Sequence, residues 1–349
     1  MDVTIRGGGV FGLVIGWECA RRGARVRLIE RHAIAAGASG GVVGALAPHV
    51  PELWNTKKAF QLDSLLMAAE FWRGVEAASG LTSGFARTGR LQPVPLGGEA
   101  LARSRRPCAE TLWQGKAQWQ VVEAAGDWAP ASPSGLLVHD TLSALIHPSR
   151  ACAALAAAFR AVGGDLVIGE AADSGAVIWA TGAQGLADLS AAFGHPVGSG
   201  QKGQALALAF DAAGLPQLQA DGLHIVPHGD GTVAVGSTSE RSYADPRTTD
   251  HLLDRLHDRA VALVPVLAGA PVVARWAGIR PRAATRAPLL GPWPGRPGHF
   301  IANGGFKIGF GMAPKVAQTM ADLVLEGRDQ IPAGFRVTDA LATMARPAA

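Results

Sequence analysis

The sequence predicts an α/β protein in which a parallel, Rossmann-like sheet lobe is interrupted by an antiparallel lobe. Three observations predict this fold class. The first 30 residues read as strand, helix and strand, short strands joined by turns fill residues 199–275, and a strand followed by a helix closes the chain. This alternation, broken by strand-rich insertions, is typical of a parallel sheet with a second sheet spliced into it. We expect residues 1–80, 141–198 and 276–345 to form the first lobe, and 81–140 and 199–275 to form the second.

The first element is a strand over residues 3–5 that leads into a glycine motif. Gly7, Gly9 and Gly12 occupy a G-x-G-x-x-G pattern, and Val10 and Phe11 open the helix that follows. The first glycine permits a tight turn, the second lets backbone approach a pyrophosphate, and the third lets the helix pack on the strand. Free N–H groups at the helix start attract phosphate. The motif predicts dinucleotide binding rather than an ordinary glycine-rich turn.

A second strand, over residues 26–29, ends at Glu30 and Arg31. A carboxylate at the end of this strand accepts hydrogen bonds from ribose hydroxyls and repels a 2′-phosphate. The order strand, glycines, helix, strand and acid therefore predicts an adenine dinucleotide that lacks the 2′-phosphate.

Glycine-rich loops and helices alternate after this unit. Residues 37–50 form a loop in which backbone can lie close to a ligand, and residues 56–79 carry apolar side chains at helical spacing. Pro148 and Gly163 bracket an alanine-rich helix. An apolar run of buried-strand type then ends in Ala180, Thr181 and Gly182, where backbone can again meet a ligand.

The second half of the chain reads mainly as strands. The turn His228-Gly229-Asp230-Gly231 between two apolar runs predicts a hairpin, and apolar residues at helical spacing predict a helix over 252–263. The other expected elements are short strands up to about residue 140, strands over 205–210, 272–277 and 299–302, and a final helix after Pro314.

Composition excludes several classes of protein. The 349 residues are 48% hydrophobic and 17% charged, which suits a globular chain with a large core. The net charge of +4 is mild and the 32 basic residues are scattered, so we do not expect nucleic acid as a partner. No apolar run reaches the ~18–20 residues that cross a bilayer. A strand that begins at residue 3 leaves no room for a signal peptide, which predicts a cytoplasmic location. The odd number of cysteines, Cys19, Cys108 and Cys152, predicts reduced, buried thiols.

Nearly the whole chain resembles the D-amino-acid oxidase family of flavoproteins, and within it the glycine oxidase and sarcosine oxidase branch. The resemblance rests on the glycine motif with Glu30 and on six further segments. These are Gly37 to Gly44, Ala180 to Gly182, Gly203-Gln204, His224 to Thr238, Trp276-Ala-Gly-Ile-Arg-Pro281 and the loop Gly304 to Gly311.

The resemblance implies a non-covalent FAD between the two lobes. Glu30 would hold the adenosine ribose, and Ser39, Gly40 and Gly41 would lie by the pyrophosphate. The segment past the isoalloxazine would be Gly44, Ala45 and Leu46. The loop that meets the flavin pyrimidine would consist of Gly304, Gly305, Phe306, Lys307, Ile308 and Gly309, just before a helix start that stabilises negative charge. Some relatives tether flavin through a cysteine in this region, but no cysteine follows Cys152, so we expect no covalent bond.

The resemblance also assigns substrate-side residues. Arg280 would grip a substrate carboxylate beside the flavin, because a guanidinium is planar, always charged and fork-shaped. The alternative is an arginine that pairs with a local acid or is solvated. Lys307 would touch substrate or favour oxygen reduction, unless it is solvated. Tyr243, the only tyrosine, and His49 are further candidates for the substrate side, although Tyr243 could lie on the surface.

The other histidines do not predict a metal site. His224 and His228 share a strand face but have no evident third ligand. His147 precedes Pro148 and is interpreted as a helix-entry residue.

The implied function is oxidation of the C–N bond of a small amino acid or secondary amine. Hydride would pass from the α-carbon to flavin N5, the imine would hydrolyse to a keto acid or aldehyde, and O2 or another acceptor would reoxidise the flavin. Two alternatives remain open. Residues 37–46 also resemble a flavin domain that oxidises a tRNA wobble-uridine side chain, and the chain could be a flavoprotein subunit of a hetero-oligomeric amine dehydrogenase.

Overall fold

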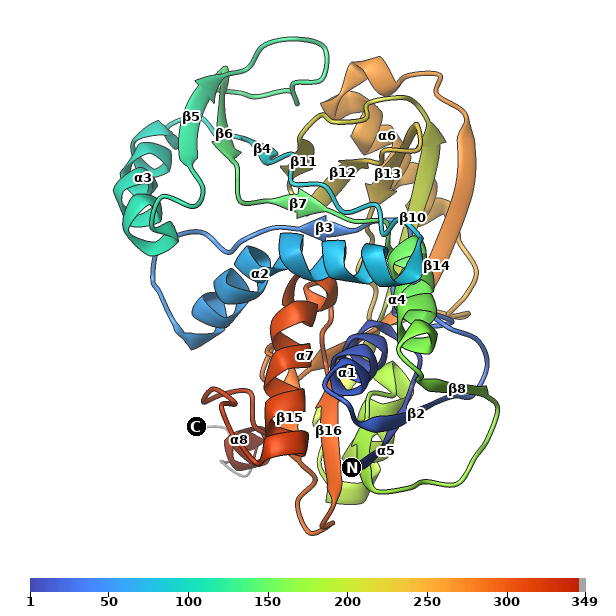
Figure 1. Ribbon diagram of the computed structural model, residues 1–349. Coiled ribbons are helices and arrows are strands. Elements are labelled where there is room, and N and C mark those ends of the chain that lie inside the picture. The colour runs from blue at the N-terminus through green and yellow to red at the C-terminus, as the bar shows by residue number, and fades with distance from the viewer. Residues whose placement is uncertain (345–349) are drawn as a thin grey trace.

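The computed structural model describes residues 1–344 and contains two large sheets, one in each half of the molecule in Figure 1. The first has six strands in the order β15-β16-β9-β1-β2-β8. Five of them are parallel, and only β15 is antiparallel to its neighbour. The strands are β1 Asp2–Arg6, β2 Arg25–Glu30, β8 Asp165–Ile168, β9 Ala176–Trp179, β15 Leu289–Pro292 and β16 His299–Asn303.

Four helices that pack on one another form the main core with this sheet. They are α1 Val10–Arg21, α2 Thr56–Ser79, α4 Pro148–Ala161 and α7 Gly309–Glu326. Helix α2 crosses the middle of the molecule between the two sheets (Figure 1). Helix α5, Gly182–Phe193, contacts β16 of the first sheet and two strands of the second, so it joins the lobes. A last helix, α8 Val337–Met344, packs near β15.

The second sheet has eight strands in the order β14-β10-β13-β12-β11-β4-β6-β5. All neighbours are antiparallel except β11 and β4. Helix α6 His251–Leu263 covers one face through a separate core. The strands are β4 Arg90–Pro93, β5 Trp119–Glu123, β6 Leu136–Asp140, β10 Gly198–Ala209, β11 Gln217–Ala220, β12 Leu223–Pro227, β13 Thr232–Gly236 and β14 Val272–Ala283. The smaller elements are β3 Ala45–Leu46 paired with β7 Ala144–Leu145, η1 Ala38–Gly40, η2 Pro265–Leu267 and α3 Glu99–Trp113.

The predicted fold class is confirmed, but several element predictions were wrong. The final helix begins at Gly309 and contains Pro314, because buried Met312 and Ala313 add an apolar turn before the proline. Helix α3 was missed, since only three of its residues are buried and Pro107 lies inside it. Cys108, on that helix, is exposed and not buried.

The lobe boundaries stay a prediction, and the one at residue 276 falls within β14. Strands β10 and β14 each have 12 residues, longer than expected, because they pair along their whole length.

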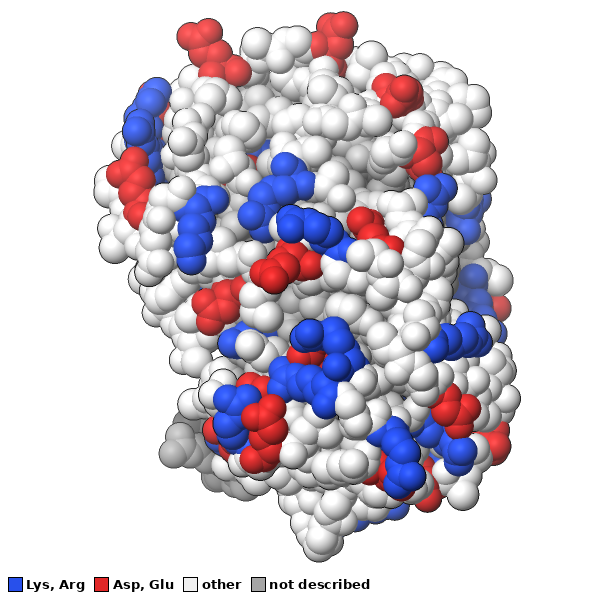
Figure 2. All heavy atoms as spheres, in the orientation of Figure 1, with Lys and Arg blue, Asp and Glu red and all other residues white. Residues whose placement is uncertain are grey.

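Surface features bear on two other predictions. Within residues 1–344, none of the helices combines the length and apolar composition needed to cross a bilayer. On the face shown in Figure 2, basic and acidic side chains are interspersed rather than gathered in one basic stripe.

Candidate functional site

One cavity of about 1010 Å³ lies between the two lobes, at the upper end of the ~300–1,000 Å³ usual for ligand pockets. Its walls come from the carboxyl ends of β1, β2 and β9, from the start of α5, from the loop before α7, and from one face of the eight-stranded sheet. In open α/β sheets, ligands bind at the carboxyl ends of the strands. The cavity therefore joins a nucleotide-binding edge to the face of a second sheet.

The glycine motif forms the wall that the sequence predicted. A Cβ at Gly7 would lie 2.4 Å from the carbonyl oxygen of Ala180, and one at Gly12 would lie 1.9 Å from that of Gly7, so neither position tolerates a side chain. Gly9 is the N-cap residue of α1 and has no side chain to bond the first N–H groups, and no acid lies in the first turn of the helix. The N–H of Val10 donates to Ser39 Oγ at 2.9 Å, which brings the second glycine-rich loop to the helix start.

Glu30 lies at the same end of the cavity and holds the glycine loop. Its Oε2 accepts from the Gly8 N–H at 2.7 Å and its Oε1 from the His32 N–H at 2.9 Å. A carboxylate has about four acceptor sites, so both oxygens keep capacity for ribose hydroxyls.

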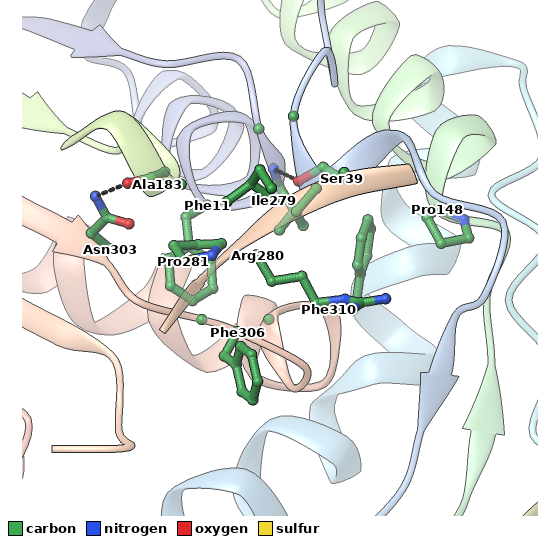
Figure 3. A pocket seen from close by; sticks show the side chains of 18 of the residues that line it. Phe11, Ser39, Pro148, Ala183, Ile279, Arg280, Pro281, Asn303, Phe306 and Phe310 are labelled. Atoms are coloured by element: carbon green, nitrogen blue, oxygen red, sulfur yellow. Dashed lines mark hydrogen bonds between the residues drawn. The ribbon is translucent and has the colours of Figure 1, made fainter. Parts of the chain in front are cut away.

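The loop before α7 is anchored to the start of α5 and to β14 of the eight-stranded sheet. Asn303 Nδ2 donates to the Gly182 carbonyl at 3.0 Å, and the N–H of Phe306 donates to the Pro281 carbonyl at 2.9 Å. Figure 3 shows Asn303 turned toward the start of α5 and Phe306 at the cavity edge. The loop leads into the first turn of α7, which contains no acid. An anionic group is therefore favoured beside it.

Most of the predicted cofactor residues line this cavity. They are Gly7, Gly9, Val10, Phe11, Glu30, Arg31, Ser39, Gly44, Ala45, Thr181, Gly182, Arg280, Gly304, Gly305, Phe306, Lys307, Ile308 and Gly309. Five others do not line it: Gly12, Gly40, Gly41, Leu46 and Ala180. The lining glycines and helix starts give a long ligand close backbone contact and places for two phosphates, so the residues present fit FAD.

Arg280 extends from β14 into the cavity (Figure 3). Its guanidinium occupies the space over Gly203 of the neighbouring strand, where a Cβ would lie 1.5 Å from one terminal nitrogen. The guanidinium lies 5.6 Å from the Trp276 ring centre and donates to the Thr238 carbonyl at 3.3 Å. It makes no direct ion pair within residues 1–344, and although the charge of Glu240 acts to raise its pKa, desolvation lowers that pKa to about 10. A largely desolvated cation without a direct ion-pair partner favours an anionic ligand.

The other three predicted substrate-side residues also line the cavity. Lys307 lines the cavity and is exposed to solvent. Desolvation together with the Arg280 charge lowers its pKa. The ring Nδ1 of His49 contacts Gln61 Oε1, and desolvation lowers the pKa of that histidine. The Tyr243 hydroxyl lies 3.6 Å from the place that a Cβ on Gly200 would take, so the tyrosine borders the cavity beside β10.

Three polar lining residues on strands of the eight-stranded sheet were missed as site candidates: Arg90, Gln219 and His224. Arg90 is buried and pairs with Asp140 at 2.8 Å. His224 Nδ1 is buried without a hydrogen-bond partner among the described residues. Desolvation, followed by the charges of Arg90, Lys307 and Arg280, lowers the His224 pKa to about 4. The sequence contained one sign that His224 belongs to a site, since it is a polar residue inside an apolar strand pattern.

His228 and His147 lie beside the loop of residues 37–50 and do not line the cavity. His228 Nε2 lies 2.8 Å from the Val42 carbonyl, and its ring centre is 4.7 Å from that of His147. Among residues 1–344, no group of three or more His, Cys, Asp or Glu side chains is arranged to hold a metal ion.

Comparison with known proteins places the chain in a family. The family described as FAD dependent oxidoreductase matches residues 2–323. Glycine oxidase of Geobacillus kaustophilus is 29% identical over 93% of this chain and 92% of that enzyme. Glycine oxidase of Pseudomonas aeruginosa is 37% identical over 131 residues, which span 37% of this chain and only 36% of that enzyme.

The fold agrees with this assignment. The crystal structure of glycine oxidase from Geobacillus kaustophilus superposes with a TM-score of 0.80 at 26% identity, over 96% of this chain and 98% of that one. These comparisons confirm two predictions made from the sequence: the family resemblance and FAD as the cofactor. The chain therefore belongs to the family of FAD-dependent oxidoreductases, in its glycine oxidase branch.

Proposed function

We propose that this protein oxidises the C–N bond of a small amine that carries a carboxylate, such as glycine, sarcosine or a D-amino acid. The observation that carries the proposal is Arg280, a largely desolvated guanidinium that faces the cavity and makes no direct ion pair among the described residues. Charge-assisted hydrogen bonds to a substrate carboxylate would satisfy it.

The chain's own residues would bind and orient the substrate. Trp276 and the bare backbone of Gly203 hold the guanidinium in place, so a carboxylate on Arg280 would have one orientation. The acidic residues that line the cavity, Glu30, Glu170 and Asp188, all belong to the lobe of the six-stranded sheet. No lining carboxylate is thus available beside Arg280 as a general base.

A deprotonated amine suits this environment. The positive charges of Arg280, Lys307 and Arg90 meet around His224, and nearby positive charge disfavours an ammonium. When bound, FAD supplies the hydride acceptor, and the imine left by loss of hydride from carbon and a proton from nitrogen is hydrolysed by water to a carbonyl product.

The cofactor-side roles follow the same geometry. Ser39 and the start of α1 would hold the pyrophosphate, Glu30 the ribose, and the Gly304 to Gly309 loop the flavin pyrimidine edge. Lys307 and the start of α7 would favour negative charge on the reduced ring.

The test is an anaerobic visible spectrum of the flavinylated protein before and after addition of glycine, sarcosine, proline and separate D-amino acids. We expect bleaching of the flavin band with at least one of them. A flavin that none of these amines bleaches would contradict the proposal. Peroxide formation on admission of air would then distinguish O2 from another electron acceptor. No observation favours the tRNA-modifying or partner-dependent alternatives, and a cytoplasmic location stays a prediction.

A further inference from the structure

The wall of the cavity beyond Arg280 contains polar side chains that a glycine-sized substrate would leave without partners. His224 on β12 and Gln219 on β11 are direct cross-strand neighbours, and both line the cavity. Arg90, on the next strand, lines it as well. Their strand neighbours Leu218, Leu223 and Ile225 point into the opposite core, so the three polar side chains share the cavity face.

Gln219 is held so that its amide nitrogen is free. Its Oε1 accepts from Arg90 Nη1 and, at 3.1 Å, from Gln92 Nε2. An arginine can only donate, so the oxygen must face Arg90 and the NH2 group must point elsewhere. Within residues 1–344 this NH2 group donates to no side chain or backbone oxygen. Arg90 is itself fixed by its buried ion pair with Asp140.

His224 adds a second unused group. Its Nδ1 is buried and has no partner among the described residues, and leaving a buried polar atom unpaired is destabilising. No carboxylate lines the cavity on this side, since the lining acids lie in the other lobe. The wall therefore offers the free N–H groups of Gln219 beside the Arg90 cation, which is an environment that a carboxylate prefers.

The distance between strands of the sheet sets how far this wall lies from Arg280. The Arg280 guanidinium lies over Gly203 of β10, and β12 is two strands further along the sheet, which is roughly 10 Å between backbones. The guanidinium also donates to the carbonyl of Thr238, which follows β13, the strand between β10 and β12. It therefore covers about half of the distance between β10 and β12. One small molecule can thus contact both Arg280 and the polar wall.

We infer that Gln219, His224 and Arg90 form a second anion subsite, so that the preferred substrate is an amine with two carboxylates, one on Arg280 and one on this subsite. The inference rests on the proposed function, because it assigns the first carboxylate to Arg280. It predicts a substrate of the type of an N-carboxyalkyl amino acid or an acidic D-amino acid, rather than glycine.

The experiment compares two ligands that cannot be oxidised as amines, diglycolate with two carboxylates and methoxyacetate with one. Both are titrated into the flavinylated protein, and Kd is read from the shift of the flavin spectrum. We expect diglycolate to bind at least about tenfold more tightly, the effect of one charge-assisted contact. Gln219→Met should reduce this preference below about threefold, and Gln219→Glu, which repels the second carboxylate, should abolish it. Gln118→Met is the matched control and should keep the preference, because this exposed glutamine precedes the edge strand β5 and does not line the cavity.

The outcomes separate this inference from the proposed function. If sarcosine or a neutral D-amino acid bleaches the flavin and diglycolate binds no more tightly than methoxyacetate, the second subsite is refuted and the proposed function stands. If diglycolate is preferred but no amine, including iminodiacetate, bleaches the flavin, the subsite is supported and the proposed reaction is refuted. The comparison in the unmodified protein decides the inference even where a variant does not fold.

Discussion

Gly203→Ala tests the substrate role of Arg280 without touching the arginine. A Cβ at this position would lie 1.5 Å from Nη1, 2.2 Å from Cζ and 2.5 Å from Nη2 of Arg280. No left-handed backbone angle is present at Gly203, so alanine adds no backbone strain there. The guanidinium must move off its place over β10, and its contact with the Thr238 carbonyl must break.

The expected loss follows from the contact that is displaced. Hydrogen bonds to a charged group contribute about 1.5–3 kcal/mol, which corresponds to roughly a tenfold to hundredfold fall in kcat/KM for a carboxylate substrate. Flavin content should stay near that of the unmodified protein. The assay is anaerobic flavin reduction at varied concentrations of whichever amine bleaches the flavin.

Two comparisons make the result decisive. In an Arg280→Ala background, Gly203→Ala should add almost nothing, because the group that it displaces is gone. Gly229→Ala is the matched control, since a Cβ there meets nothing within 4 Å. An unchanged kcat/KM in Gly203→Ala, or fully additive losses in the double variant, would refute the placement of the substrate carboxylate on Arg280.

Three further predictions concern the cofactor, the core and pH. Glu30→Ala should lower the ratio of flavin to protein absorbance after purification, because the carboxylate that fixes the glycine loop is lost; full flavin content would count against its role. Asp140→Ala leaves Arg90 buried and unpaired and should lower the unfolding free energy in urea by about 3–5 kcal/mol, against under about 1 kcal/mol for the exposed Glu110→Ala. The pKa of His224 is lowered to about 4 in the folded protein, so only the unfolded chain takes up its proton as pH falls from about 6.5. Stability should therefore fall toward pH 4 by up to about 1.4 kcal/mol per pH unit, and His224→Asn should flatten that slope in urea unfolding.

Much of the nucleotide-binding edge could be predicted from the sequence because its requirements are local. A tight turn, a close backbone approach and a free helix start each demand a residue type at a fixed spacing, as at Gly7 and Gly12. The Arg280 prediction came from a short segment that resembles a known family. Helix α3 and the true start of α7 could not be predicted in this way, because the burial that defines them depends on partners far along the chain.

By itself, the sequence determined the βα order, the dinucleotide motif and the acid that follows it. The tertiary structure alone decided which polar groups are left without partners. Arg280 carries an ion-pairing side chain, and only packing shows that within residues 1–344 it donates to the Thr238 carbonyl and forms no direct ion pair. Arg90 and Gln219 are 129 residues apart, and only sheet pairing brings them together and frees the glutamine NH2 group. Local motifs reflect the conformational requirements of neighbouring residues, whereas charge pairing and burial depend on contacts between distant strands.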